Sequence, residues 1–146
     1  MNEARESVAE YGYFTSSELT LVMPMYRLSS TQRDVWDTVL GWMEPGGIVR
    51  RGRQDIAYRL GIHPNTVSSA LSRLIELRLM WRKGQRLFQV NPHAAYKSKT
   101  GDPEEWLRAV EHLSTDAPSL FAPNYERRPP RRRDDGRAKD RHLRSV

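Results

Sequence analysis

The sequence predicts an α+β fold that is mainly α-helical: a three-helix core with a small β-hairpin wing, an extra C-terminal helix and a disordered basic tail. Two segments lead to this prediction. Residues 54–74 have the pattern of two short helices joined by a tight turn, and residues 79–92 have the pattern of a short hairpin. A helix, a turn, a second helix and a basic hairpin, in this order, make up a winged helix-turn-helix.

The chain has 146 residues, which is enough for one compact domain with tails. We expect an N-terminal arm over residues 1–28, a winged-helix domain over residues 29–97, a further helix within residues 98–116 and a basic tail over residues 117–146. Proline, arginine and aspartate dominate the tail. Because such a composition cannot bury a core, the tail is expected to be disordered.

Within the arm, residues 13–24 carry mixed signals. Thr15 and Glu18 have the spacing of a capping box, which favours a helix. The side chains from Leu19 to Met23 favour a strand instead. Both alternatives lead to the same expectation, which is an ordered arm that packs on the core.

The first core helix is expected to follow the caps at residues 29–31 and to run to Glu44, because apolar side chains recur at helical spacing up to that point. The Pro-Gly-Gly sequence of residues 45–47 ends it. Residues 48–51 then have the pattern of a short strand that can pair with the hairpin.

The second and third core helices are expected at residues 53–60 and 64–77. Ala57 leaves room where the two helices approach, and Gly61 suits the left-handed backbone of a tight turn. Pro64 is tolerated in the first turn of the third helix. The seam between these helices is apolar and consists of Ile56, Leu60, Ile62, Val67, Leu71 and Leu74.

Two further elements follow the third helix. Trp81, Leu87 and Phe88 favour the two strands of the hairpin, with a turn at residues 83–85. Asp102 and Pro103 are suitable residues to begin a last helix. This helix is expected over residues 104–113, with an apolar face formed by Trp106, Leu107, Val110 and Leu113.

The positive charge of the chain is concentrated where these motifs lie. The formal net charge is +6, but residues 50–99 hold 11 basic and 2 acidic residues, a net of +9. Residues 1–49 and 100–123 are each net −4, and residues 124–146 are net +5. A basic segment that coincides with a helix-turn-helix is the expected footprint of a face that binds a polyanion.

The candidate DNA contacts follow from this footprint. Asn65 and Thr66 begin the recognition helix, and an asparagine can pair with adenine through two hydrogen bonds. His63 either contacts DNA or caps the helix. The hairpin cations are expected to crowd at the tip and touch phosphates. The full set is Arg53, Gln54, His63, Asn65, Thr66, Ser68, Ser69, Arg73, Arg82, Lys83 and Arg86.

The stretch from Thr31 to Lys97 resembles the winged-helix regulators of the MarR type. It resembles more closely the RepL-type plasmid replication proteins and related actinobacterial regulators. The resemblance rests on residues 55–71, on Leu-Met-Trp-Arg at residues 79–82 and on the Asn-Pro exit within residues 88–97. It implies a protein that binds double-stranded DNA and either controls transcription or initiates plasmid replication.

The sequence gives no sign of an enzyme, a metal site or a cofactor. Its four histidines lie far apart, it has no cysteine, and the glycines of residues 47–54 lack the Lys-Ser/Thr of a phosphate loop. We expect a cytoplasmic protein that is nucleoid-associated when bound to DNA, with no membrane segment. A homodimer is expected, because a single winged helix reads only a short site. The alternative interpretation is a winged-helix module that binds another protein.

Overall fold

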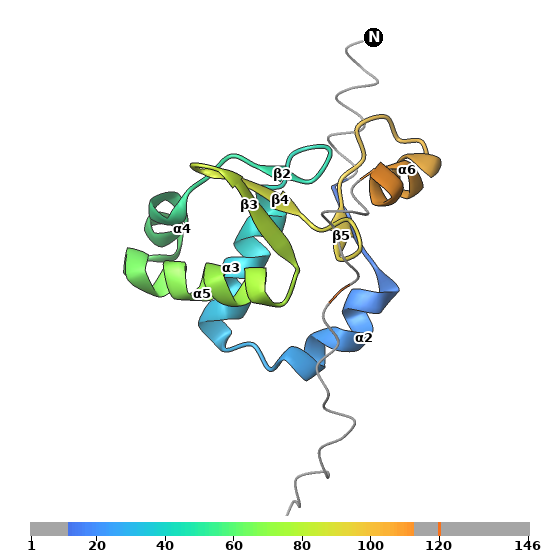
Figure 1. The fold of residues 1–146 in the computed structure, drawn as a ribbon. Helices are drawn as coiled ribbons and strands as arrows, with labels where there is room; N and C mark the ends of the chain where they lie inside the picture. The colour runs from blue at the N-terminus through green and yellow to red at the C-terminus, as the bar shows by residue number, and fades with distance from the viewer. Residues whose placement is uncertain (1–11, 113–119, 121–146) are drawn as a thin grey trace, which may run out of the picture.

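The computed structural model describes residues 12–112 and Leu120, and within them it shows an α+β fold with five helices and two small antiparallel sheets (Figure 1). The elements in chain order are β1 (Phe14–Thr15), α2 (Ser17–Tyr26), α3 (Ser30–Gly41), β2 (Ile48–Val49), α4 (Arg53–Leu60), α5 (Pro64–Glu76), β3 (Met80–Gly84), β4 (Leu87–Val90), β5 (Ala95–Tyr96) and α6 (Glu104–His112).

The core lies where α3, α4 and α5 pack on one another and on the inner face of the larger sheet (Figure 1). The predicted seam forms: Ile56, Val67 and Leu74 are fully buried, and Leu60 and Ile62 are half-buried beside them. Leu120 is also buried in this core, although it belongs to the range expected to be a disordered tail. The remainder of that tail lies outside the described residues.

α3 begins as its sequence predicts and ends earlier than expected. The Ser29 hydroxyl accepts the Gln32 backbone N–H, and the Gln32 side chain accepts the Ser29 N–H, which completes a capping box. The helix ends at Gly41 rather than at Glu44. The reason is that the Glu44 N–H bonds to the Ile48 carbonyl at 2.7 Å, so this residue already belongs to the tight turn that leads to β2.

The larger sheet has the strand order β2-β4-β3, so the short strand after α3 does pair with the hairpin. The hairpin turn consists of Gln85 and Arg86, because β3 continues as far as Gly84. The expected turn at residues 83–85 is therefore wrong. A shift of register between Arg82 and Gly84 extends the strand, and Arg86 takes a left-handed backbone with φ of 52° to close the turn.

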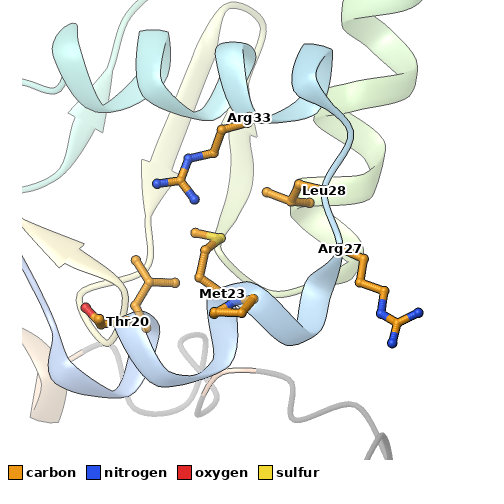
Figure 2. A pocket seen from close by; sticks show the side chains of 7 residues that line it. Thr20, Met23, Arg27, Leu28 and Arg33 are labelled. Atoms are coloured by element: carbon orange, nitrogen blue, oxygen red, sulfur yellow. The ribbon is translucent and has the colours of Figure 1, made fainter. Parts of the chain in front are cut away.

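The described part of the N-terminal arm, residues 12–28, is ordered and packs on the core, as expected for residues 13–24. Ser16, not Thr15, caps α2, and the buried side chains of this helix are Leu19 and Tyr26. β1 pairs antiparallel with β5, which holds the arm against a segment about 80 residues away in sequence. A hollow of about 470 Å³ separates α2 from α3, and Figure 2 shows Met23 and Arg33 facing one another across it while Arg27 points away.

α6 begins at Glu104, and the Asp102 carboxylate accepts the Glu104 N–H at 2.9 Å, as its predicted capping role requires. Its predicted apolar face is wrong in one respect, because Leu107 is 53% exposed and Glu105 is buried instead. Leu113 lies outside the described residues. No helix in the described part of the chain is long and apolar enough to cross a membrane.

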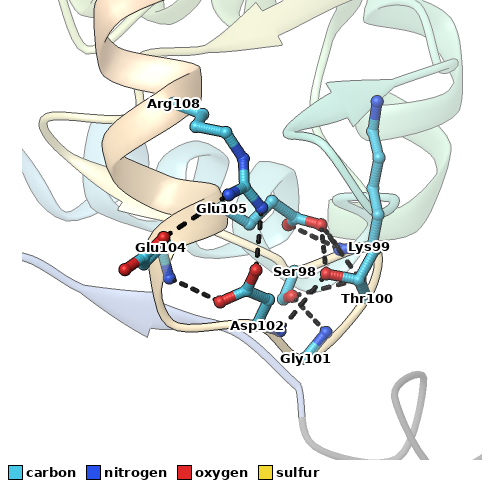
Figure 3. Close-up of polar contacts among 8 residues, drawn as sticks. All are labelled: Ser98, Lys99, Thr100, Gly101, Asp102, Glu104, Glu105 and Arg108. Carbon is cyan, nitrogen blue, oxygen red and sulfur yellow. Dashed lines mark hydrogen bonds and ion pairs between the residues drawn. The ribbon is translucent and has the colours of Figure 1, made fainter.

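Buried Glu105 is held by the loop that precedes its own helix (Figure 3). Its carboxylate accepts the backbone N–H groups of Lys99 and Thr100 and the Thr100 hydroxyl. Burial alone would raise the pKa of Glu105, but these hydrogen bonds, with others from Tyr96 and Ser98, lower it below its ordinary value. The ionised carboxylate therefore stabilises the junction between β5 and α6.

Glu105→Gln should lower the free energy of unfolding near neutral pH. Because the folded-state pKa of Glu105 is depressed, the stabilisation is complete above the ordinary value of about 4.5 and is lost as the pH falls through the folded-state pKa. Thermal unfolding of both proteins from pH 7 to pH 3 measures this. The two curves of stability against pH should converge in acid, and a constant difference over the whole range would contradict the assignment.

Candidate nucleic-acid interface

The turn between α4 and α5 brings the two helices into close contact. Gly61 ends α4 with φ of 67°, a left-handed conformation that costs little for glycine, and its N–H bonds back to the Ala57 carbonyl. Ala57 is 4% exposed, so a larger side chain would push the helices apart. The geometry is the one that the glycine and alanine positions predict.

α5 begins with a histidine cap. The Nδ1 atom of His63 accepts the backbone N–H of Asn65 at 3.1 Å, and Pro64 occupies the first helical position. Of the two roles left open for His63, the structure shows capping. The His63 side chain is exposed, as are those of Asn65 and Thr66 in the first turn of α5.

The outward face of α5 is polar. Asn65, Thr66 and Ser69 are exposed, whereas Ser68 is half-buried and accepts a hydrogen bond from Arg53 Nη1 at 3.3 Å. Arg73 lies near the far end of the helix and is paired with Glu76 at 3.1 Å, which offsets part of its charge. The side chains available for contact therefore lie at the N-terminal half of α5.

A groove of about 550 Å³ lies between the start of α4 and the β3–β4 hairpin. Three arginines line it, Arg53 from α4, Arg82 from β3 and Arg86 from the turn. The Arg82 guanidinium lies over the ring of its cross-strand partner Phe88, 5.0 Å from the ring centroid, and this contact holds it against the hairpin. Gln54 also lines this groove.

Asp55 connects the hairpin to α4. One carboxylate oxygen, Oδ2, accepts both the Gly52 N–H and the Arg86 Nη2 donor, each at 2.8 Å. The pKa of Asp55 lies below its ordinary value, first because of the Gly52 N–H and then because of Arg86. A Cβ on Gly52 would lie 3.0 Å from Arg86 Cγ, so glycine permits the close approach. Arg86 is thus anchored to α4 rather than extended from the hairpin tip.

Lys83 does not join the other hairpin cations. Lys83 is the extra residue at the register shift between Arg82 and Gly84, and it lines a separate hollow with Lys99 and Arg108. The expected cluster of Arg82, Lys83 and Arg86 at the tip is therefore split. Two of its members line the groove beside α4, and the third faces the side of α6.

A further hollow, of about 500 Å³, lies on the outer face of α4, and the sequence pattern was not interpreted as predicting it. Tyr58 is 93% exposed there, and the Arg51 guanidinium lies 5.1 Å from the centroid of the Trp42 ring. Arg59 also lines it. Tyr58 follows Gln54 by four residues, so the helical period of α4 was the signal that could have placed both on one face.

No group of three or more histidine, aspartate or glutamate side chains within the described ranges is arranged to hold a metal ion. No protein-family model, curated protein or solved structure matches this chain.

Proposed function

We propose that this chain is a winged helix-turn-helix protein that binds double-stranded DNA in a sequence-specific manner. α5 is the recognition helix and the β3–β4 hairpin is the wing. One observation carries the proposal: Arg53 lines the three-arginine groove and also donates to Ser68 on α5. The polar face of α5 and the basic groove therefore form one continuous surface.

The contacts divide by chemistry. Asn65 and Thr66, at the N-terminal end of α5, enter the major groove and read base edges. Arg53, Arg82 and Arg86 bind backbone phosphates and fix the register of the helix. A phosphate replaces Asp55 as the partner of Arg86, which is already held in place. No catalytic step and no cofactor forms part of this proposal.

The process served by this binding is either control of transcription or initiation of plasmid replication, as the resemblance of residues 31–97 implies. Selection of bound fragments from a genomic library distinguishes the two. A recovered site at the promoter of the chain's own gene supports the regulator, and a site at a replication origin supports the initiator. Recovery of fragments without a common sequence would contradict specific binding altogether.

A second candidate function is recognition of another protein, and the outer face of α4 favours it. Tyrosine, tryptophan and arginine are the residues that most often dominate protein interfaces, and Tyr58, Trp42 and Arg51 gather here. Salt separates the alternatives, because DNA binding weakens steeply as salt rises whereas an apolar protein interface does not.

Asn65→Ala should weaken binding at the preferred site by about 1–3 kcal/mol and relax the preference at one base position. The reason is that Asn65 is exposed at the start of α5, where only base contacts would give it a role in sequence preference. Titration against the preferred site and its single-base variants measures both effects. Equal weakening on every sequence would show that Asn65 touches phosphate only.

The chain should form a homodimer, because two copies related by a two-fold axis double the contacts and fix the half-site spacing. The arm and α6 are the two elements outside the helix-turn-helix that could pair in such a dimer. Leu19 and Tyr26 are buried within their own subunit, but Leu21 is 76% and Leu107 53% exposed. Sedimentation at micromolar concentration should give twice the monomer mass. A monomer both free and bound to a non-palindromic site would contradict this.

A further inference from the structure

An aromatic groove of about 310 Å³ lies between β1, β5 and the start of α6. The Phe14 ring is packed edge-on against two others, with centroids 6.2 Å from Tyr96 and 6.4 Å from Trp106. The Trp106 indole N–H donates to the Pro92 carbonyl, so this ring is fixed. Tyr13 and Phe14 remain 42% and 45% exposed, which leaves their apolar faces uncovered in the described residues.

One acidic side chain, that of Asp102, lines this groove, and the α6 segment that borders it is rich in acidic residues. Residues 100–112 hold four acidic residues and one arginine. Arg108 pairs with both Asp102 and Glu104, yet the Glu104 side chain stays 77% exposed and Glu111 is exposed as well. An occupant should therefore combine an apolar, ring-like surface with positive charge.

We propose that residues 127–133 of the same chain, Arg-Arg-Pro-Pro-Arg-Arg-Arg, dock in this groove. Prolines adjacent in sequence favour a polyproline II conformation, and aromatic-lined grooves bind that conformation because little entropy is lost on binding. The five arginines of the segment complement the acidic residues of the adjoining loop and α6, and its two prolines supply apolar rings for Phe14 and Trp106.

The length of the chain permits this contact. Leu120 is buried in the core, and Pro129 follows it by nine residues, a reach of up to about 30 Å in extended form. A domain of this size has a radius of gyration of about 13 Å, so the groove is within reach. Of the other segments outside the described ranges, residues 1–11 hold three acidic residues and one basic, residues 113–119 hold one acidic residue, and residues 134–146 hold four basic and three acidic residues but no proline.

Docking would keep the arginines of the tail away from the three-arginine groove. Figure 1 shows β5 and α6 at the end of the molecule opposite to α4. The contact is independent of DNA binding, and its test needs no nucleic acid.

The test uses the full chain, which has no cysteine of its own. Ala138→Cys takes a nitroxide label, and the indole N–H signals of Trp106 and Trp42 are followed by NMR. Trp106 should lose most of its intensity at low salt while Trp42, beside α4, keeps its own. Loss at neither indole, or equal loss at both, would overturn the proposal. Mixing labelled chain with isotope-enriched unlabelled chain should produce no loss, and a loss there would show that the contact joins two chains.

Charge exchange supplies the matched variants. Arg131→Glu, Arg132→Glu and Arg133→Glu together should restore the Trp106 signal without changing any residue of the described core. Adding Glu104→Arg and Glu111→Arg to this tail variant should restore the loss of Trp106 intensity, because the tail segment is then acidic and α6 is basic. The control is the same tail variant combined with Glu76→Arg on α5, which should leave the Trp106 signal at full intensity. Quenching that persists in the tail variant, or that Glu76→Arg restores equally, would refute the docking.

Discussion

Replacing Arg53, Arg82 and Arg86 together with alanine should weaken binding to every duplex by about 10²- to 10³-fold at about 0.1 M salt. Each phosphate contact contributes about 0.9 to the slope of log affinity against log salt, so the slope should fall by nearly 3. Loss of Arg86 also leaves Asp55 without its ion-pair partner, which adds repulsion toward the phosphates. Titrations at several salt concentrations measure the slope and the affinity together.

Lys83→Ala is the matched control for this variant. Lys83 neighbours Arg82 in β3 but lines the hollow on the side of α6, so its loss should leave the slope almost unchanged. An unchanged slope in the triple variant would remove the groove from the interface. A fall on loss of Lys83 as large as that on loss of Arg82 would show that binding follows total charge and not this surface.

Asn91→Ala should lower the free energy of unfolding by about 2–4 kcal/mol. Asn91 is fully buried; its amide donates to the Arg78 carbonyl at 2.7 Å and its side-chain oxygen accepts the His93 N–H at 2.9 Å. Removing the side chain deprives two backbone groups of these partners, each at a cost of about 1–3 kcal/mol. Thermal and denaturant unfolding should show a melting temperature lower by about 10–20 °C.

The control for this prediction is Asn65→Ala, which removes the same kind of side chain from an exposed position. The two asparagines should separate function from stability: loss of Asn65 changes DNA preference and not the melting temperature, and loss of Asn91 does the reverse. A melting temperature unchanged by Asn91→Ala would mean that water replaces both hydrogen bonds. The Asn-Pro exit, which suggested a resemblance to replication proteins, would then have no structural explanation.

The elements that the sequence predicts well are those with strong local signals. α4 begins and ends at the expected residues, and α5 ends one residue before its expected end, because Gly61, Pro64 and the apolar period all lie within the motif itself. The end of α3 could not be predicted in the same way. Helical periodicity continues past Gly41, and only the backbone contact between Glu44 and Ile48 decides the boundary.

The contacts that were missed depend on residues far apart in sequence. β1 and β5 have two residues each, too few for alternation to reveal them, and they pair across the whole domain. The ion pair of Asp55 with Arg86 joins residues 31 apart, and the separation of Lys83 from Arg82 requires the strand to extend to Gly84. Local pattern could place these side chains on elements but could not assemble the groove.

Burial of Glu105 has a similar origin. The apolar period of α6 favours Leu107 on the inner face, and a glutamate is rarely buried. Its position is set by the backbone N–H groups of Lys99 and Thr100, which need an acceptor and have no signature in the sequence. The polar requirements of the loop outweigh the apolar pattern of the helix here.

The central claim is that α5 reads DNA sequence, and competition binding tests it most directly. The full chain is titrated with a duplex selected from a random-sequence library and with a shuffled duplex of the same length and composition, at physiological salt. We predict that the selected site binds at least about 10³-fold more tightly. Equal affinity for the two duplexes would contradict sequence-specific recognition and leave only the electrostatic attraction of the basic groove.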